Sequence, residues 1–187
     1  MKVKFSKREN TKEHPQYMYL KILFLDSSAI LSWFLKNDVG TMQAGGKNVM
    51  DIHNEQTRIP CSLNISQTVY DEVIKKLKQF YKDDNIIIRK YISLLNDFYL
   101  IDKNQKDVEK IEERRGALIN RHPDLKKKRN SQDSRILNEL ISYLEIFTGK
   151  SGPILVSCDN NMNNIASLES WNVFNPREKS IEDLKAF

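Results

Sequence analysis

Short apolar runs alternate along the chain with longer segments in which apolar residues recur every three or four positions. The runs at 22–25 and 154–156 have the length and composition of strands that are buried on both faces. Shorter strands are predicted at 63–65 and 98–102, and a last edge strand at 173–174. The chain therefore carries the apolar pattern of a small sheet whose central strands are covered on both sides.

The longer segments have the periodicity of amphipathic helices. Because they alternate with the strands, we expect an α/β fold with a mostly parallel sheet, in which ligands sit at the carboxyl ends of the strands. The helices are predicted at 27–35, 68–81, 85–96, 107–119, 132–147 and 163–170.

The chain has 187 residues, which suits one domain with its own core. Residues 1–20 are charged and are expected to form a basic N-terminal arm, so that the domain covers 21–187. Residues 36–60 are mostly polar and are expected to form a loop or insertion with at most a short helix. Residues 120–130 are expected to form a basic loop.

Composition narrows the class of protein. Hydrophobic content of 40% is that of a globular chain, and no apolar run approaches the roughly 20 residues that span a bilayer. The N-terminal segment is too polar for a signal peptide, so we expect a cytoplasmic protein without a membrane partner. The two cysteines are far apart and the three histidines are scattered, which argues against a disulfide framework or a zinc ribbon. The net charge of +5 fits a polyanionic partner without proving one. No glycine-rich nucleotide-binding motif is present.

Two aspartates follow the most apolar strands. Asp26 comes directly after the strand at 22–25, and Asp159 comes three residues after Val156. Both are expected at the carboxyl edge of the sheet. Two interpretations stay open for each of them: a functional carboxylate, or a helix N-cap whose side chain accepts hydrogen bonds from backbone N–H groups.

Asp133 lies at the start of the helix predicted at 132–147. At about 100° per residue, Asp133 points toward the centre of that helix's apolar face, whereas Glu139 points well away from it. A carboxylate on an apolar face is unfavourable unless it is paired or bound to a metal. The alternative is that the helix begins one turn later and Asp133 is exposed.

Glu72 and Asp71 are neighbours that the same geometry separates. The buried stripe of the helix at 68–81 passes close to Glu72, whereas Asp71 points toward solvent. Glu72 is therefore the candidate site residue. Four carboxylates that converge on one cleft would repel one another and raise one another's pKa. Hard divalent cations make such a cluster tolerable, so we expect one or two Mg²⁺ or Mn²⁺ ions bound by Asp26, Glu72, Asp133 and Asp159.

Four segments in order resemble the motifs of the PIN-domain nuclease family. "FLDSSAIL" is similar to the first, a strand that ends in Asp followed by small hydroxyl residues, and "ISQTVYDEV" to the second. "QDSRILNEL" resembles the third and "ILVSCDNNMNNIA" the fourth, in which a strand ends in a hydroxyl residue, one further residue and Asp. The resemblance covers about 21–176. The order of the four segments along the chain carries the resemblance.

The resemblance implies a Rossmann-like single domain with strand order 3-2-1-4-5 and metal-dependent endonuclease activity, usually on RNA. Asp26, Glu72, Asp133 and Asp159 would be the catalytic and metal-binding residues, with Ser28 and Ser157 as supporting hydroxyls. The chain is most similar to the VapC-like toxins of toxin–antitoxin pairs. Against these compact proteins it adds segments at about 36–60 and 103–130, and it has Asn161 where many relatives have a second acidic residue.

Several alternatives concern the partner and the substrate. Basic residues close to Asp133 could contact phosphates of a nucleic acid. The alternative is that they form a solvated loop. These residues are Lys126, Lys127, Lys128, Arg129 and Arg135. The substrate is expected to be single-stranded or structured RNA, with DNA as an alternative. A degenerate module that binds RNA or protein without cutting also stays open. An antitoxin, another protein or a second copy of the chain are the protein partners considered.

Overall fold

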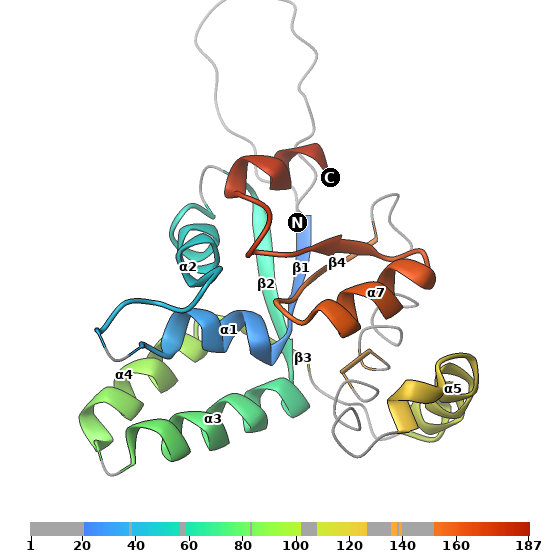
Figure 1. Ribbon diagram of the computed structural model, residues 1–187, viewed down its shortest axis with the longest axis horizontal. Coiled ribbons are helices and arrows are strands. Elements are labelled where there is room, and N and C mark those ends of the chain that lie inside the picture. Colours follow the sequence, from blue (N-terminus) through green and yellow to red (C-terminus); the bar gives the residue numbers. More distant parts are fainter. Residues whose placement is uncertain are drawn as a thin grey trace, which may run out of the picture.

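A five-stranded sheet in the order β3-β2-β1-β4-β5 forms the centre of the molecule in the computed structural model (Figure 1). Every neighbouring pair of strands is parallel, so the predicted α/β class and strand order are confirmed. The strands are β1 (Lys21–Leu25), β2 (Cys61–Ser66), β3 (Tyr99–Ile101), β4 (Ile154–Val156) and β5 (Asn172–Phe174). The structure describes residues 21–37, 39–56, 59–82, 84–101, 108–126, 136, 137, 139 and 152–187.

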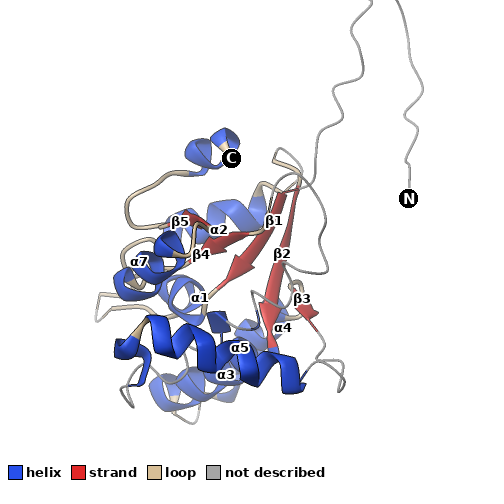
Figure 2. Ribbon diagram, turned by 90° about the vertical axis from the view of Figure 1, so that its right-hand side faces the viewer, coloured by secondary structure: helices blue, strands red, loops and turns tan. Residues whose placement is uncertain are grey.

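Helices flank this sheet and pack on one another at one end of it. In Figure 2 the arrowheads of β1 and β2 point in the same direction, toward the end of the molecule at which α3 and α5 lie. The helices are α1 (Ser27–Phe34), α2 (Gly46–Asn54), α3 (Gln67–Tyr81), α4 (Asn85–Leu95), α5 (Val108–Arg121) and α7 (Asn160–Leu168), with short 3-10 turns η2 (Pro123–Lys126) and η4 (Ile181–Ala186). Among the residues that the structure describes, no helix has both the length and the apolar character needed to span a membrane.

The core forms around β1, which has a strand on each side. Leu23 and Phe24 are completely buried in β1, and Leu155 is equally buried in β4. Trp33 and Phe34, at the end of α1, contribute further buried aromatic rings to the same core. Asn64 of β2 is a buried polar side chain inside the sheet, and its amide donates to the carbonyl oxygens of Leu23 and Ser62 at 3.1 and 3.0 Å.

One helix begins earlier than expected from the sequence, and the segment 36–60 contains the short helix for which the sequence left room. The helix predicted at 163–170 begins at Asn160, since Asp159 caps it and the three residues after Asp159 are already helical. The segment 36–60 contains α2, which packs against α1. A side chain on Gly46 would place a Cβ 2.1 Å from the carbonyl oxygen of Ser32, so only glycine permits this close contact between the two helices.

Glu169, at the end of α7, joins that helix to α5. Its carboxylate accepts hydrogen bonds from Arg121 at 2.9 and 2.8 Å and lies 2.7 Å from the ring of His122. The hydrogen bonds from Arg121 lower the pKa of Glu169 from its usual value of 4.5. This contact ties the end of α5 to the part of the chain that follows β4.

We expect Glu169→Gln to destabilise the protein by about 1 kcal/mol at pH 7, because a neutral amide loses the ionic part of this contact. A carboxyl group whose pKa is lower in the folded protein than in the unfolded chain stabilises the fold at pH values above its unfolded-state pKa. This contribution is lost as the pH falls below 4.5 toward the lowered pKa of the folded state. Urea denaturation of both proteins from pH 7 to pH 3 should therefore show a difference that shrinks below pH 4.5. Glu113→Gln, at an exposed position on α5, is the control that should behave like the wild type at every pH.

Candidate active site

Asp26 lies directly after β1 and is buried, with 2% of its surface exposed. Its backbone N–H donates to the carbonyl of Val156 at 2.9 Å, which ties the residue to the end of β4. Its Oδ2 accepts hydrogen bonds from the hydroxyls of Ser28 at 2.5 Å and Ser157 at 3.0 Å, and from the backbone N–H of Ser28 at 3.2 Å. Asp26 is thus both the N-cap of α1 and a carboxylate held by two serines.

Burial and hydrogen bonding act on Asp26 in opposite directions. Loss of hydration raises the pKa of Asp26 above its usual 3.8, while the hydroxyls of Ser28 and Ser157 partly lower it again. The net shift is upward. Six of the eight residues of α1 are buried too, so Asp26 caps a helix that itself lies in the core.

Glu72 comes from α3 and reaches Asp26 through a shared hydroxyl. Ser66, the last residue of β2, caps α3 and sets where that helix begins. The Ser27 hydroxyl donates to Glu72 Oε2 at 2.9 Å and also lies 3.3 Å from Asp26 Oδ1. One hydroxyl proton therefore faces two carboxylates from different strand–helix junctions.

The pKa of Glu72 is also raised. Burial is the largest cause, the hydrogen bond from Ser27 opposes it, and the charge of Asp26 raises the pKa further. Asp71, the neighbouring residue, is exposed and accepts a hydrogen bond from Gln67 at 2.8 Å. The two adjacent acids thus differ as the helical geometry predicts: Glu72 faces Asp26, and Asp71 faces solvent.

Asp159 reaches the same edge of the sheet through Ser157. Its backbone N–H donates to the Ser157 hydroxyl at 3.0 Å, and that hydroxyl donates to Asp26. The Oδ1 of Asp159 accepts from the backbone N–H groups of Asn161 at 2.7 Å and Met162 at 3.0 Å. Asp159 therefore acts as the N-cap of α7, and the side chain of Asn161 is exposed beside it.

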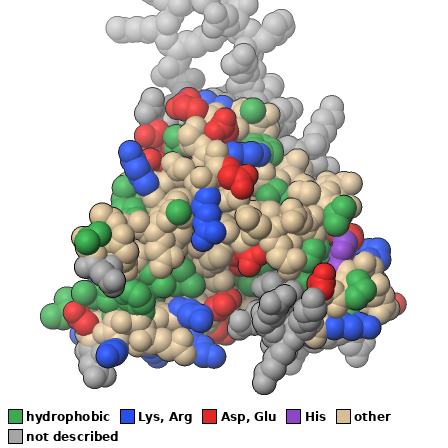
Figure 3. All heavy atoms as spheres, viewed as in Figure 1, with side chains coloured by type: hydrophobic (Ala, Val, Ile, Leu, Met, Phe, Trp, Pro, Cys, Tyr) green, Lys and Arg blue, Asp and Glu red, His purple; other side chains and the backbone are tan. Residues whose placement is uncertain are grey.

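Asp133, the remaining carboxylate of the predicted site, lies outside the described residues, as do Lys127, Lys128, Arg129 and Arg135. Lys126 is described and is exposed at the end of η2. On the face shown in Figure 3, basic and acidic side chains are interspersed instead of gathering in one basic patch. Contact between phosphates and these basic residues stays a prediction.

Glu139 is a buried carboxylate that the sequence analysis did not select as a site residue. We expected it to point away from the apolar face of its helix, and the structure gives it 5% exposed surface. Its Oε1 accepts a hydrogen bond from Thr68 at 2.7 Å, and Thr68 lies one turn before Glu72 on α3. Helical spacing reports only which face of its own helix a residue occupies, so it gave no signal for the contact between Glu139 and Thr68 of α3.

The donor set suits a hard divalent cation. Asp26 and Glu72 offer carboxylate oxygens, which Mg²⁺ and Mn²⁺ prefer. Burial raises the pKa of both, and the charge of Asp26 raises the pKa of Glu72 further, a repulsion that a cation would relieve. Within the described residues, no group of three or more His, Cys, Asp or Glu side chains is arranged to hold a metal. Of the four predicted metal ligands, Asp26 and Glu72 are therefore the two that the structure brings together on one hydroxyl.

Ser28 stabilises both Asp26 and the start of the β4–α7 connection. Its hydroxyl donates to Asp26 and accepts from the backbone N–H of Cys158 at 3.0 Å. We expect Ser28→Ala to lower the free energy of unfolding by about 1–3 kcal/mol at pH 7, because it leaves the backbone N–H of Cys158 without a partner and removes one of the hydroxyl hydrogen bonds to the buried carboxylate of Asp26. Ser28→Thr keeps the hydroxyl and should retain most of this stability in urea denaturation. Equal stability of Ser28→Ala and the wild type would contradict the role.

Comparisons with known proteins identify the fold. No protein-family model matches the sequence, and no curated protein sequence matches it. Among solved structures, the chain is similar to one in VapBC-1 from nontypeable Haemophilus influenzae, with a TM-score of 0.52 and 18% sequence identity. The similarity covers 83% of this chain and 98% of that one. At this identity the likeness shows the fold, and it agrees with the PIN-like sheet expected from the four motifs.

Proposed function

We propose that the protein is a metal-dependent endonuclease that hydrolyses phosphodiester bonds of RNA. The observation that carries the proposal is the pair of carboxylates, Asp26 and Glu72, which share the hydroxyl of Ser27 at the carboxyl edge of a PIN-like sheet. This edge is where parallel α/β sheets place their ligands. A helix cap alone does not require a second carboxylate beside it, so a chemical role explains the pairing of Asp26 with Glu72 better.

The residues would divide the work as follows. Asp26 and Glu72, with Asp133 and Asp159, would hold one or two Mg²⁺ or Mn²⁺ ions. When bound, such ions activate a water molecule and stabilise charge on the phosphate and the leaving oxygen. Ser28 and Ser157 hold Asp26 by donating to its Oδ2, which favours its charged form. Ser27 orients Glu72 toward Asp26.

The proposed biological setting is that of a toxin in a toxin–antitoxin pair. Two observations support it: the four motifs resemble those of VapC-like toxins, and the fold is similar to a chain of VapBC-1. The partner in this setting is an antitoxin, and the excess of basic residues suits an RNA substrate.

A second candidate function is binding of RNA or protein without cleavage. It is favoured by Asp159, whose Oδ1 is occupied by two backbone N–H groups, as in an ordinary helix cap. Asn161 adds an amide beside it in place of a carboxylate. A binding module would keep the fold and these hydrogen bonds but would have no specific affinity for a divalent metal.

Two measurements test the proposal. Labelled single-stranded RNA and DNA of the same sequence are incubated with the full chain and Mn²⁺ or Mg²⁺, with and without a chelator. We expect RNA to be cut only without chelator, and DNA to be cut much more slowly. Isothermal titration with Mn²⁺ should show stoichiometric binding that Asp26→Asn removes. RNA binding with neither cleavage nor metal binding would favour the second candidate.

A further inference from the structure

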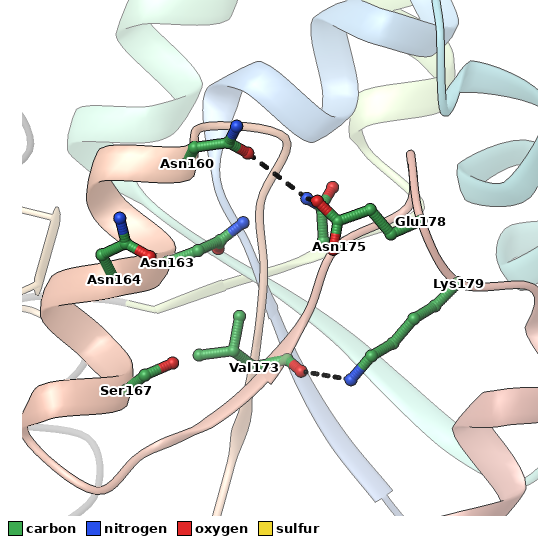
Figure 4. Close-up of a pocket in the computed structure, with 8 residues that line it drawn as sticks. All are labelled: Asn160, Asn163, Asn164, Ser167, Val173, Asn175, Glu178 and Lys179. Carbon is green, nitrogen blue, oxygen red and sulfur yellow. Dashed lines mark hydrogen bonds between the residues drawn. The ribbon is translucent and has the colours of Figure 1, made fainter.

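A polar pocket lies between α7 and the segment that follows β5. Its volume is about 370 Å³, within the usual range of about 300–1,000 Å³ for small-molecule sites. Figure 4 shows side chains from α7 on one side, Val173 of β5 below, and Asn175, Glu178 and Lys179 on the other side. Four of its eight lining residues are asparagines: Asn160, Asn163, Asn164 and Asn175.

Asn163 indicates that this pocket is more than a surface hollow. It is 8% exposed, and in Figure 4 its amide points from α7 into the space between the two sides. Its Nδ2 donates to the carbonyl oxygen of Ser157 at 3.0 Å, whereas its Oδ1 has no hydrogen-bond partner among the described residues. A buried amide oxygen is costly to leave unpaired, so a donor placed against this wall of the pocket would be favourable.

The lining chemistry selects the class of ligand. One carboxylate and one ammonium balance each other, so the pocket is not built for a phosphate alone or for a divalent cation. The Lys179 ammonium is already engaged, since it donates to the Val173 carbonyl at 3.2 Å and lies 5.0 Å from the ring centre of Phe187. Amides offer donors and acceptors side by side, which matches the edge of a nucleobase.

The pocket is aligned with the candidate active site. Leu25, Val156 and Phe174 are in register across β1, β4 and β5. The next residues are Asp26, Ser157 and Asn175, so the pocket begins two strands, or about 10 Å, from Asp26 at the same edge of the sheet. Asn175 donates to Asn160 at 3.4 Å, and Asn160 directly follows Asp159.

We propose that this pocket binds a nucleobase of the RNA substrate, next to the phosphate that is cut, and so sets a base preference. The inference rests on the proposed function, because it assumes that the substrate is RNA and that one of its bases is recognised beside the candidate active site. Asn163 and Asn164 on α7 would pair with the edge of the base, and Ser167 would border its far end.

Binding is tested with single nucleotides, in the absence of divalent metal. The four ribonucleoside 5′-monophosphates and ribose 5-phosphate are titrated into the full chain and followed by NMR. We expect at least one nucleotide to bind tenfold or more tightly than ribose 5-phosphate. Asn164→Ala should weaken it at least fivefold, and Ser167→Phe, which fills the pocket, at least tenfold. Asn172→Ala, an exposed asparagine of β5 outside the pocket, should change it less than twofold.

The results separate this inference from the proposed function. The pocket assignment would be overturned, even if RNA is cut, by either of two results. In the first, no nucleotide binds better than ribose 5-phosphate. In the second, nucleotides bind to Asn164→Ala and Ser167→Phe as tightly as to the wild type. Selective nucleotide binding without any cleavage would support the pocket and reject the nuclease. In a randomised RNA, we expect the wild type to prefer one base at one position near the cut. In Asn164→Ala, the ratio of cleavage at the preferred base to cleavage at the other bases should fall at least fivefold.

Discussion

Asp26→Asn is expected to lower metal-dependent RNA cleavage by about a thousandfold or more, equivalent to about 4 kcal/mol of transition-state stabilisation. The carboxylate lies at the centre of the site, with Ser28 and Ser157 on one oxygen and Ser27 near the other. An amide of the same shape loses the charge that would hold the cation. The measurement is the single-turnover cleavage rate at saturating Mn²⁺.

This loss is not expected to come from unfolding. Burial raises the pKa of Asp26, which means that the charged form is disfavoured in the folded protein. A neutral amide removes that penalty, so the thermal midpoint of Asp26→Asn at pH 7 should equal or exceed that of the metal-free wild type. A variant that stays folded and still cuts RNA at the wild-type rate would rule out the site.

Three further variants locate the effect. Glu72→Gln should reduce cleavage by a similar factor, because it removes the second carboxylate that faces Ser27. Asp71→Asn is the matched control: its side chain is exposed on the same helix, and its cleavage rate should stay within twofold of the wild type. Asp159→Asn retains a good N-cap for α7, so a large loss of cleavage there would separate a metal-binding role from capping.

Phe24→Ala is expected to destabilise the protein by about 3–5 kcal/mol, the largest effect on folding that we predict. Phe24 is completely buried in β1, which has β2 on one side and β4 on the other. Removing its ring leaves a cavity that paired strands cannot close by moving. For a chain of this size, such a loss corresponds to a fall of about 6–20 °C in the thermal midpoint.

Phe80→Ala is the control for this prediction. Phe80 lies near the end of α3 with 48% of its surface exposed, so the same substitution should cost less than about 1 kcal/mol. Urea denaturation of the three proteins gives the comparison directly. A similar decrease in the free energy of unfolding for both variants would contradict the central place of Phe24 in the core.

The apolar pattern of the sequence was sufficient to predict the architecture. Runs such as 22–25 and 154–156 are typical of strands covered on both faces, and their alternation with amphipathic helices predicts a parallel sheet. The strand order itself came from the motif resemblance, and the structure confirms it. Helical periodicity also separated Glu72 from Asp71, because both lie on one regular helix whose buried face is marked by apolar residues.

What the sequence could not determine is which polar groups from distant segments meet. Ser27 touches Glu72 across 45 positions, and Ser157 touches Asp26 across 131. Glu139 is buried and accepts a hydrogen bond from Thr68, a contact that spacing along its own helix did not predict. The amide-lined pocket lies between α7 and the segment after β5. Local periodicity reports only the face that a residue occupies on its own element. The packing of several elements decides its neighbours, and the candidate site and the pocket depend on those neighbours.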